Sequence, residues 1–441
     1  MTRTLIHSGT VFDGTGAGPR PADVVLEDDR ILDIGTGLDG DLAVDATGLT
    51  VLPGLIDCHV HTVLSGADRL GMMEEPFSYQ FFAAARNLRR TLDCGITTVR
   101  DAGGADLGVK AALADGLIEG PDVVAAITVL GQTGGHTDGW LANGECLRLL
   151  TPHPGRPDMI VDGPAEMRVR VRELVRAGAD VIKVCTSGGV LSPRDDPRHA
   201  HFDDEELAVC VAEAARAGLA VMAHAQGAEG VRNAVRAGAR SIEHGIHLDD
   251  TAIGMMADAG VWLVPTLLAP IALTERMDAG AAFPEAVVRK ARDVVEVHRA
   301  SVRRAAEAGV RIAMGTDSGV FPHGSNLREL ELLHAAGLDG PAVLRAATSS
   351  AAELLGLGDR TGTLAPGRRA DLLLLAGDPF DFAEYRSRVR VVFQRGRQVR
   401  RYGTGADGEP PGEASAGAGA EGSRIGPAGR GAPAGGAHGG Q

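Results

Sequence analysis

The stretch Ala217-Gly218-Leu219-Ala220-Val221-Met222-Ala223-His224 decides the fold, because the pattern that it contains recurs along the chain. Each copy joins an amphipathic helix, an Ala-Gly or Cys-Gly pair and a short apolar strand. A glycine at this position fits the left-handed conformation in which many helices end. The pair occurs at Cys94-Gly95, Ala177-Gly178, Ala217-Gly218, Ala237-Gly238, Ala259-Gly260 and Ala308-Gly309. The middle of the chain is therefore predicted to alternate helices with strands.

The predicted strands favour a parallel sheet, since strands that alternate with helices pair in parallel. They are Leu52–His61, Thr97–Arg100, Val123–Leu130, Val181–Cys185, Ala220–His224, Ser241–His244, Val261–Thr266 and Arg311–Thr316. This set fits a closed (β/α)8 barrel, the TIM barrel. An open doubly wound sheet is the alternative, but no GxGxxG sequence follows the first strand. We therefore expect an α/β protein built on a TIM barrel.

Both ends of the ordered sequence are rich in short strands separated by glycine turns. These strands are expected at Thr4–His7, Asp23–Glu27, Ile31–Ile34, Ala370–Leu375 and Val389–Gln394. We expect residues 1–50 and 362–402 to form one small β-sandwich domain, with the barrel at residues 51–361. Residues 403–441 are rich in Gly, Ala and Pro, and we expect a disordered tail because they hold too few large apolar side chains to fold.

The composition narrows the classes of partner. The chain has 441 residues with a formal net charge of −14, which argues against binding to nucleic acid or an anionic membrane. Its five cysteines include no CxxC pair, so neither a disulfide framework nor a cysteine zinc site is expected. The sequence shows no secretory leader and no apolar run of membrane-spanning length. We expect a cytoplasmic protein that acts on a small molecule.

Residues that can bind metals end five of the predicted strands: His59, His61, Lys183, His224, His244 and Asp317. Each one alone has an ordinary explanation, such as a core histidine, a turn aspartate or a salt-bridged lysine. Lys183 is the exception that needs a reason, because its charge would lie in the apolar run 181–185. The carboxyl ends of barrel strands meet at one mouth, where imidazole and carboxylate groups suit zinc and similar ions. Together these positions predict a metal site.

With these residues the chain resembles the amidohydrolase superfamily over residues 1–402. The matching motifs are Pro53-Gly54-Leu55-Ile56-Asp57-Cys58-His59-Val60-His61, Ile182-Lys183, Ala223-His224-Ala225, Glu243-His244-Gly245 and Gly315-Thr316-Asp317. The closing run Gly367-Arg368-Arg369-Ala370-Asp371-Leu372 resembles the family's return strand into a small β-sandwich. The resemblance implies two divalent metal ions, with zinc expected and manganese, iron or cobalt as alternatives.

The resemblance also implies a role for each predicted ligand. His59, His61 and Asp317 would bind the first ion, and His224 and His244 the second. Lys183, converted by CO2 into a carbamate, would bridge the two ions. A metal-bridging hydroxide would then attack a carbonyl, while Asp317 takes up the proton and passes it to the leaving nitrogen.

The subgroup that the chain resembles is prolidase-like and imidazolonepropionase-like, and includes Xaa-Pro dipeptidases and related carboxypeptidases. Such a resemblance implies cleavage of the amide C–N bond in a dipeptide or an N-acyl amino acid. Because relatives commonly form dimers or larger assemblies, a homo-oligomer is expected.

Five further positions are predicted to contact the substrate, and one of them departs from the family pattern. His136 is expected to contact the substrate carboxylate or the developing oxyanion, and so to take part in catalysis. The Gly188-Gly189 pair would let the backbone approach a ligand, and His323 is a further candidate contact. Gln226 stands where peptidase relatives carry a tyrosine, which puts the peptide substrate class in doubt. Arg194 and His199 or His201, on the long loop after the fourth strand, are alternative substrate contacts, but we expect this loop to face solvent.

Three other functions remain open at this stage. A lactonase or phosphotriesterase could use the same metal centre. A mononuclear deaminase or cyclic-amidine hydrolase would be expected to carry a glutamate three residues after His224, where this chain has Gly227. A catalytically inactive scaffold would be expected to have lost ligands, and all of them are present.

Overall fold

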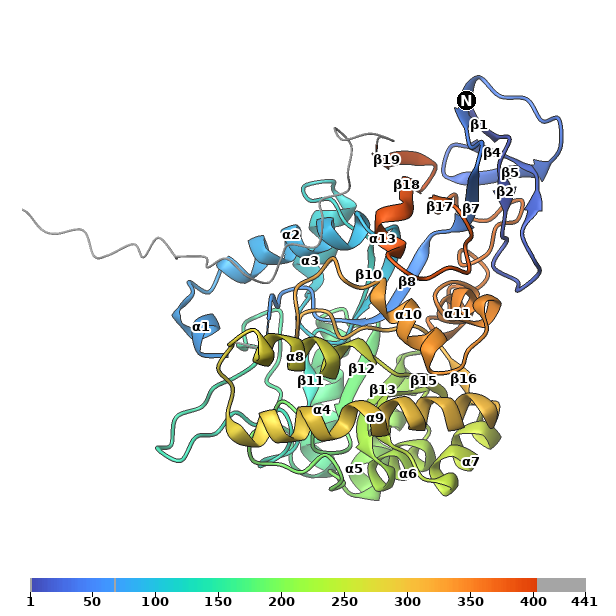
Figure 1. Ribbon diagram of the computed structural model, residues 1–441. Coiled ribbons are helices and arrows are strands. Elements are labelled where there is room, and N and C mark those ends of the chain that lie inside the picture. Colours follow the sequence, from blue (N-terminus) through green and yellow to red (C-terminus); the bar gives the residue numbers. More distant parts are fainter. Residues whose placement is uncertain (1, 67–68, 403–441) are drawn as a thin grey trace, which may run out of the picture.

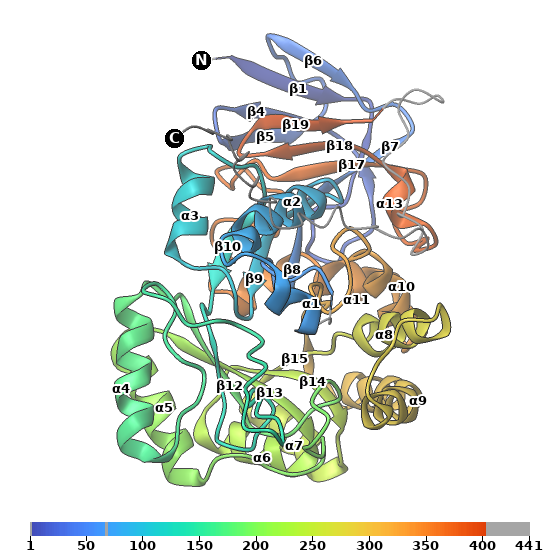
Figure 2. The same ribbon diagram turned by 90° about the vertical axis from the view of Figure 1, so that its left-hand side faces the viewer.

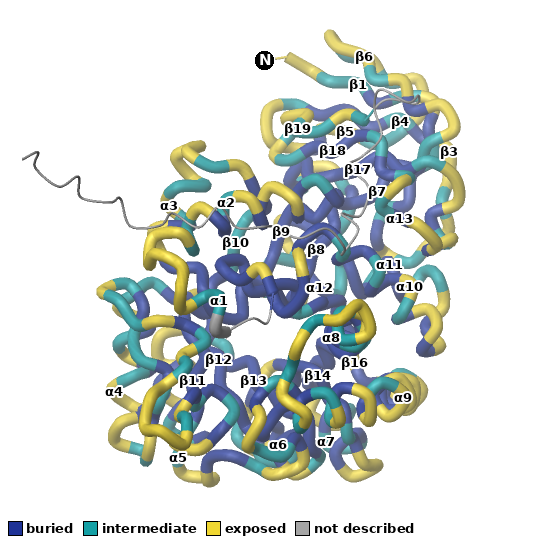
Figure 3. Tube along the Cα trace, turned by 60° about the vertical axis from the view of Figure 1, so that its left-hand side comes forward, coloured by how far each residue is buried: buried dark blue, intermediate teal, exposed yellow. Residues whose placement is uncertain are grey.

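The computed structural model describes residues 2–66 and 69–402, and the expected tail at 403–441 lies outside these residues. Strands from the two ends of the chain gather at one end of the molecule (Figure 1), and the helices and strands of the middle of the chain form the remainder. Buried residues follow the strands of this middle part, while exposed residues lie on the helices and loops around them (Figure 3).

The middle of the chain forms two parallel sheets, with strand orders β10-β9-β8 and β11-β12-β13-β14-β15-β16. Their strands are β8 (Leu55–Val60), β9 (Ile96–Asp101), β10 (Asp122–Ala125), β11 (Val129–Leu130), β12 (Val181–Cys185), β13 (Ala220–Gly227), β14 (Ser241–His247), β15 (Trp262–Val264) and β16 (Arg311–Ile312). The register pairs Lys183 with Met222 and Ala225 with His244. The prediction of an α/β protein with parallel strands is confirmed.

Helices alternate with these strands and lie around them (Figure 2). They are α1 (Arg69–Glu74), α2 (Tyr79–Leu92), α3 (Leu107–Ala114), α4 (Gly163–Arg176), α5 (Asp204–Arg216), α6 (Ala228–Ala237), α7 (Asp250–Ala259), α8 (Leu268–Asp278), α9 (Glu285–Glu307), α10 (Arg328–Ala335), α11 (Gly340–Ala346) and α12 (Ser349–Leu354). Gly238 and Gly260 end α6 and α7 in the left-handed region, with φ of 98° and 65°, as the repeated pattern predicts. Across the described ranges, no helix is both long and apolar enough to cross a membrane.

Hydrogen bonds join the two parallel sheets at both of their margins. On one side, Asp180 N, just before β12, donates to Ala125 O of β10 at 2.8 Å. On the other, Cys58 N donates to Met314 O at 2.8 Å and Asp317 N donates to His59 O at 2.7 Å. The last strand is shorter than the expected 311–316, because the residues that follow it bond elsewhere. Met314 N donates to Ala346 O, and Thr316 N donates to the Asp57 carboxylate. One continuous closed ladder is therefore not formed, and the (β/α)8 barrel stays a prediction.

Strands from both chain ends pair in two further sheets, with orders β5-β4-β1-β6 and β19-β18-β17-β7-β2-β3. They are β1 (Arg3–His7), β2 (Thr10–Val11), β3 (Arg20–Pro21), β4 (Asp23–Glu27), β5 (Arg30–Gly35), β6 (Leu42–Asp45), β7 (Leu49–Pro53), β17 (Leu372–Ala376), β18 (Val389–Gln394) and β19 (Arg397–Arg401), with the short helix α13 (Tyr385–Arg388) before β18. Leu372 and Leu374 pack with Ile6 and Val24, whereas Leu373 joins the core of the middle part. Alternate side chains of β17 thus pack on the strands of the chain ends and on the α/β part. The domain boundaries at residues 50 and 362 stay a prediction.

We expect Leu373→Ala to lower the free energy of unfolding by about 2–5 kcal/mol, because it opens a cavity in a closely packed core. Leu373 is fully buried on β17, between β7 and β18. The matched control is Leu42→Ala, since Leu42 on β6 is 57% exposed and its truncation should change stability by less than about 0.5 kcal/mol. Urea unfolding followed by circular dichroism measures both variants, and equal losses would contradict the packing described here.

Candidate active site

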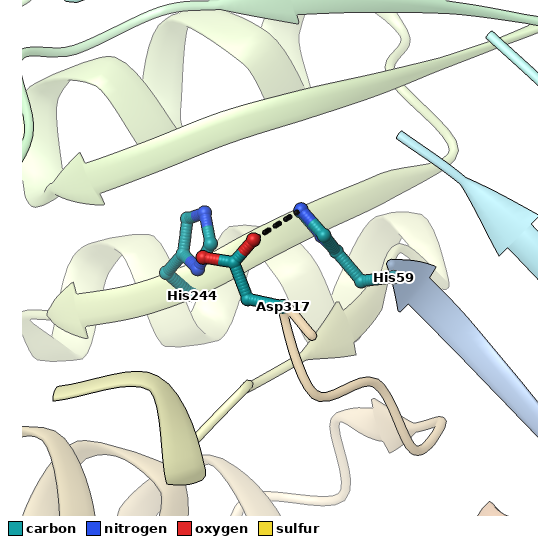
Figure 4. Close-up of side chains that lie close together, drawn as sticks. All are labelled: His59, His244 and Asp317. Carbon is teal, nitrogen blue, oxygen red and sulfur yellow. Dashed lines mark ion pairs between the residues drawn. The ribbon is translucent and has the colours of Figure 1, made fainter. Parts of the chain in front are cut away.

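His59 on β8, His244 on β14 and Asp317 in the segment after β16 come together in a buried cluster (Figure 4). Each residue offers one ligand atom, and these atoms all lie within 4.8 Å of one another. His59 Nε2 lies 3.5 Å from Asp317 Oδ1. His61 Nε2 approaches the same oxygen at 3.3 Å. One carboxylate oxygen therefore faces two imidazoles, an arrangement that could hold a divalent ion.

His224 extends this cluster from β13. Its ring centroid lies 4.7 Å from that of His244, which in turn lies 5.1 Å from that of His59. The Nε2 edge of His224 lies 3.1 Å from the carbonyl oxygen of Gly188. The four predicted histidine ligands thus form one continuous group. The tightest grouping places His244 with His59 and Asp317, whereas the sequence assigned His244 to the second ion.

Lys183 enters the same cavity from β12, with its side chain 2% exposed. Its Nζ has no hydrogen-bond partner among the described residues. Burial lowers the pKa of Lys183, because an ammonium group in this apolar strand would lose its hydration. The structure therefore brings all the predicted ligands to one cavity and leaves the lysine as an unpaired buried amine.

The backbone at the cluster is held in an unusual conformation. His244, Thr266 and Asp317 have positive φ values of 74°, 57° and 63°, a region that residues with a Cβ rarely adopt. His244 Nδ1 lies 2.7 Å from Thr266 Oγ1, a contact that ties two of these residues together. Strained backbone of this kind is typical of functional sites, where neighbouring contacts impose it.

Burial keeps three of the histidines uncharged. It lowers the pKa of His59 to about 4, and it lowers the pKa values of His224 and His244 well below the ordinary histidine value. Burial opposes ionisation of Asp317, but the hydrogen bond with His61, whose own pKa Asp317 raises, outweighs burial and lowers the pKa of Asp317. Neutral imidazoles and an ionised carboxylate are the protonation states that metal ligands need.

A buried carboxylate that the sequence analysis did not assign orients His59. Glu243 Oε2 lies 2.7 Å from His59 Nδ1, which leaves Nε2 for the cluster. Arg100 donates to both oxygens of Glu243, at 2.8 and 3.0 Å, and to the carbonyl of Cys58. Carboxylates behind histidine ligands commonly fix their ring orientation. An arginine inside the buried strand Ile96–Asp101 was the available sequence signal, because such a charge requires a buried partner.

A cavity of about 680 Å³ opens above the cluster. His136 and Gln226, two of the predicted substrate contacts, line it, and so does Arg194, which is exposed on the loop after β12 as expected. The Oε1 atom of Gln226 is buried and has no partner within the described part of the chain. Trp140 and Arg276, which the sequence analysis did not single out, also line the cavity.

The other predicted substrate contacts lie outside this lining. A Cβ at Gly189 would approach His136 Cε1 to 2.1 Å, so this glycine gives the imidazole room. Gly188 supplies the carbonyl beside His224. His323 is buried behind the cluster, with Nε2 3.2 Å from His61 O and Nδ1 3.2 Å from Thr91 Oγ1. These residues position the histidines around the cavity.

His136 is held at its Nδ1 edge, which lies 2.8 Å from Ser192 Oγ and 3.4 Å from Asp195 Oδ2. Its ring stacks on His224 with 4.4 Å between centroids. Lys290 of α9 fixes the loop that carries these partners, since Nζ donates to the carbonyls of Gly189, Ser192 and Asp195 at 2.6, 2.5 and 3.0 Å. The Nε2 edge of His136 is consequently the one available to the cavity.

Comparison with known proteins places these features in a family. Residues 50–399 match the amidohydrolase family. The ochratoxinase of Aspergillus niger is 34% identical over 433 residues, covering 92% of this chain and 88% of that protein. A Xaa-Pro dipeptidase structure with bound methionine has a TM-score of 0.83 at 33% identity, covering 90% of this chain and 99% of that one. A prolidase complexed with N-methylphosphonate-L-proline has a TM-score of 0.83 at 34% identity, covering 91% and 100%.

We expect Glu243→Gln to weaken metal binding about 10–100-fold, because the amide no longer supplies the negative charge behind His59. It also leaves Arg100 buried without a counter-charge, so the free energy of unfolding should fall by about 3–5 kcal/mol. Zinc titration with a fluorescent competitor and urea unfolding measure the two effects. Glu296→Gln is the control, because Glu296 lies in an exposed ion pair with Arg299. Equal zinc affinities in the two variants would contradict the role given to Glu243.

We expect Lys290→Met to loosen residues 186–202. Hydrogen bonds from a charged donor contribute about 1.5–3 kcal/mol, so amide exchange in this loop should speed up at least about tenfold. Hydrogen–deuterium exchange with mass spectrometry measures this directly. Lys110→Met is the control, since Lys110 on α3 pairs with Asp180, which precedes β12, at the opposite end of that strand from this loop. Unchanged exchange in peptides that contain Gly188 would show that Lys290 does not anchor the loop.

Proposed function

This chain belongs to the amidohydrolase family and is a hydrolase, and we propose that it cleaves the amide bond of a small N-acyl amino acid or dipeptide at a two-metal centre. The family and the prolidase-like neighbours inferred from the sequence are confirmed. The names of the related proteins support amide cleavage, because prolidases and Xaa-Pro dipeptidases act on peptide bonds. The two-metal centre and the substrate class are proposals.

The unpaired amine of Lys183 is the observation that carries the two-metal proposal. A buried amine beside four imidazoles and a carboxylate has no ordinary structural explanation in this fold. Its lowered pKa favours the uncharged form, which is the form that reacts with CO2 to give a carbamate. A carbamate on this arm is an anion with two oxygens, so it suits a position between two cations. The residues present thus fit the metal centre that the family implies.

In this proposal His59, His61 and Asp317 would hold one ion, and His224 and His244 would hold the other. Lys183, as a carbamate, would supply a further anionic ligand. Bound divalent ions would supply Lewis acidity, which makes a water molecule more acidic and polarises a carbonyl group.

The side chains of the cavity carry the remaining steps. Asp317 is ionised, so it accepts a proton from the attacking water and delivers it to the leaving nitrogen. His136 directs Nε2 into the cavity, where it contacts the reacting carbonyl oxygen. Gln226 offers the substrate amide N–H a buried acceptor, its Oε1, which has no partner among the described residues. The Gln226 carboxamide replaces the phenol of peptidase relatives and leaves the metal ligands unchanged.

We also propose that the two parallel sheets act as one (β/α)8 barrel beside a β-sandwich of residues 1–50 and 362–402. The hydrogen bonds at both sheet margins support a closed barrel. The pairing of β17 with β7 supports a sandwich assembled from both chain ends.

Elemental analysis of wild type and Lys183→Ala tests the proposed centre. We expect about two ions per wild-type chain and a sharp fall in the variant. After growth with ¹³C-bicarbonate, wild type should show a carbamate carbon signal in its NMR spectrum, and Lys183→Ala should not. Lys110→Ala is the control for loss of a lysine. One ion in both proteins, without a carbamate signal, would contradict the two-metal centre.

The reaction class is tested by a panel of N-acyl amino acids, dipeptides, lactones and phosphotriesters. We expect turnover of the amides by the metal-loaded wild type. Cleavage of lactones or phosphotriesters with intact amides would contradict the proposed bond specificity.

A further inference from the structure

Two arginines face the cavity without a charged partner in the protein. Arg276 of α8 and Arg194 of the loop after β12 both belong to its lining. Within residues 2–66 and 69–402, neither guanidinium pairs with a carboxylate, whereas arginines such as Arg100 and Arg369 do. An arginine that lines a cavity and lacks a counter-ion can pair with an anionic group of a ligand.

Arg276 is the better placed of the two for a ligand. It is only partly exposed, its Nη1 donates to Val320 O at 3.2 Å, and its guanidinium carbon lies 5.6 Å from the ring centroid of Phe283. These contacts hold the side chain but leave most of its five N–H groups free. Arg194 is exposed and lies over Trp140, 5.0 Å from the ring centroid.

The wall around these cations is mostly apolar. It includes Leu141, Leu147, Leu149, Val190, Leu191, Leu273, Phe283 and Val287. A volume of about 680 Å³ falls in the range of pockets that enclose drug-sized ligands, so a small dipeptide would leave much of it unfilled. Burial of apolar ligand surface against such a wall contributes about 25 cal/mol per Å².

Arg276 and the leucine-rich segment of the wall, residues 141–149, lie on different sides of the metal ligands. Arg276 follows β15, and Leu141, Leu147 and Leu149 follow β11. In the sheet, β12, β13 and β14 separate these two strands. The same intervening strands carry Lys183, His224 and His244, so a ligand that reaches both sides crosses the ligand cluster.

We propose that the substrate is an N-acyl amino acid with a bulky apolar acyl group, and that Arg276 binds its free carboxylate. This inference rests on the proposed amide hydrolysis. The acyl group packs against Leu141, Leu147 and Leu149, which places the scissile amide between the two ends, at the metal ligands. Water adds to the acyl carbon, the C–N bond breaks, and one water proton moves to the nitrogen. The products are an apolar carboxylic acid and a free amino acid. His136 is then left to contact the reacting oxygen.

N-(2-naphthoyl)-L-leucine, its C-terminal primary amide and N-acetyl-L-leucine test this assignment. Release of naphthoic acid or acetate by the metal-loaded enzyme gives kcat/KM for each compound. Wild type should prefer naphthoyl-leucine at least tenfold over the amide, which lacks the carboxylate, and at least tenfold over the acetyl compound. Arg276→Gln should bring the ratio of kcat/KM for naphthoyl-leucine to kcat/KM for its amide close to one, because KM for the acid rises. Arg276→Lys should restore part of this ratio. Arg236→Gln, on the exposed face of α6, should leave the ratio as in wild type.

Other results would overturn the assignment. A ratio that falls in Arg194→Gln and not in Arg276→Gln would move the carboxylate to Arg194. Equal turnover of naphthoyl-leucine and acetyl-leucine would remove the case for a bulky acyl group. Thermal unfolding midpoints show whether each variant is folded. If Arg276→Gln does not fold, Arg276→Lys, which keeps the charge, is compared with wild type in its place.

Calorimetry on metal-free protein separates this inference from the proposed function. Tighter binding of naphthoyl-leucine than of its amide, with that difference lost in Arg276→Gln, supports the carboxylate contact without any turnover. If such binding occurs but the metal-loaded enzyme cleaves none of the compounds, the proposed amide hydrolysis fails and the carboxylate contact stands. Cleavage without any acid preference overturns the carboxylate contact alone.

Discussion

The buried carboxylate of Glu243 is the group on which the geometry of the site depends. It accepts hydrogen bonds from Arg100 on β9 and faces His59 on β8, while its own backbone belongs to β14. A carboxylate removed from water is costly unless donors and cations replace its hydration. The three strands must therefore bring these partners together. Once they do, His59 can turn only one ring edge, Nε2, toward Asp317.

Strands and connecting segments contribute different parts of the cavity above this network. Strand ends supply the polar floor, with the histidines, Lys183 and Asp317. Loops and α8 supply a wall that is largely apolar and carries Arg276. Chemistry at the floor needs fixed distances, which short, buried strands provide. Selection of a substrate needs shape and charge, which longer segments can change without disturbing the floor.

Much of this arrangement could be predicted because local signals carry it. The helix-ending glycines mark where each helix stops, and Gly238 and Gly260 have the expected positive φ. Histidines and Asp317 at strand ends had to meet if the strands ran in parallel. The final strand was shorter than expected because residues after Ile312 bond to Ala346 and Asp57. His323 lies behind His61 for a similar reason, since its partners come from distant segments.

The sequence by itself determined the order of helices and strands, the identity of the metal-type residues and the resemblance to a family. These properties depend on periodicity, turn chemistry and short motifs, which are local. Tertiary structure alone decided that Glu243 faces His59 across 184 residues and that Lys290 reaches the loop beside His136. It also decided that Arg276 lines the cavity without a carboxylate partner in the described chain. Such pairings depend on how strands and helices pack, so a local sequence pattern cannot predict which distant charged group a side chain will contact.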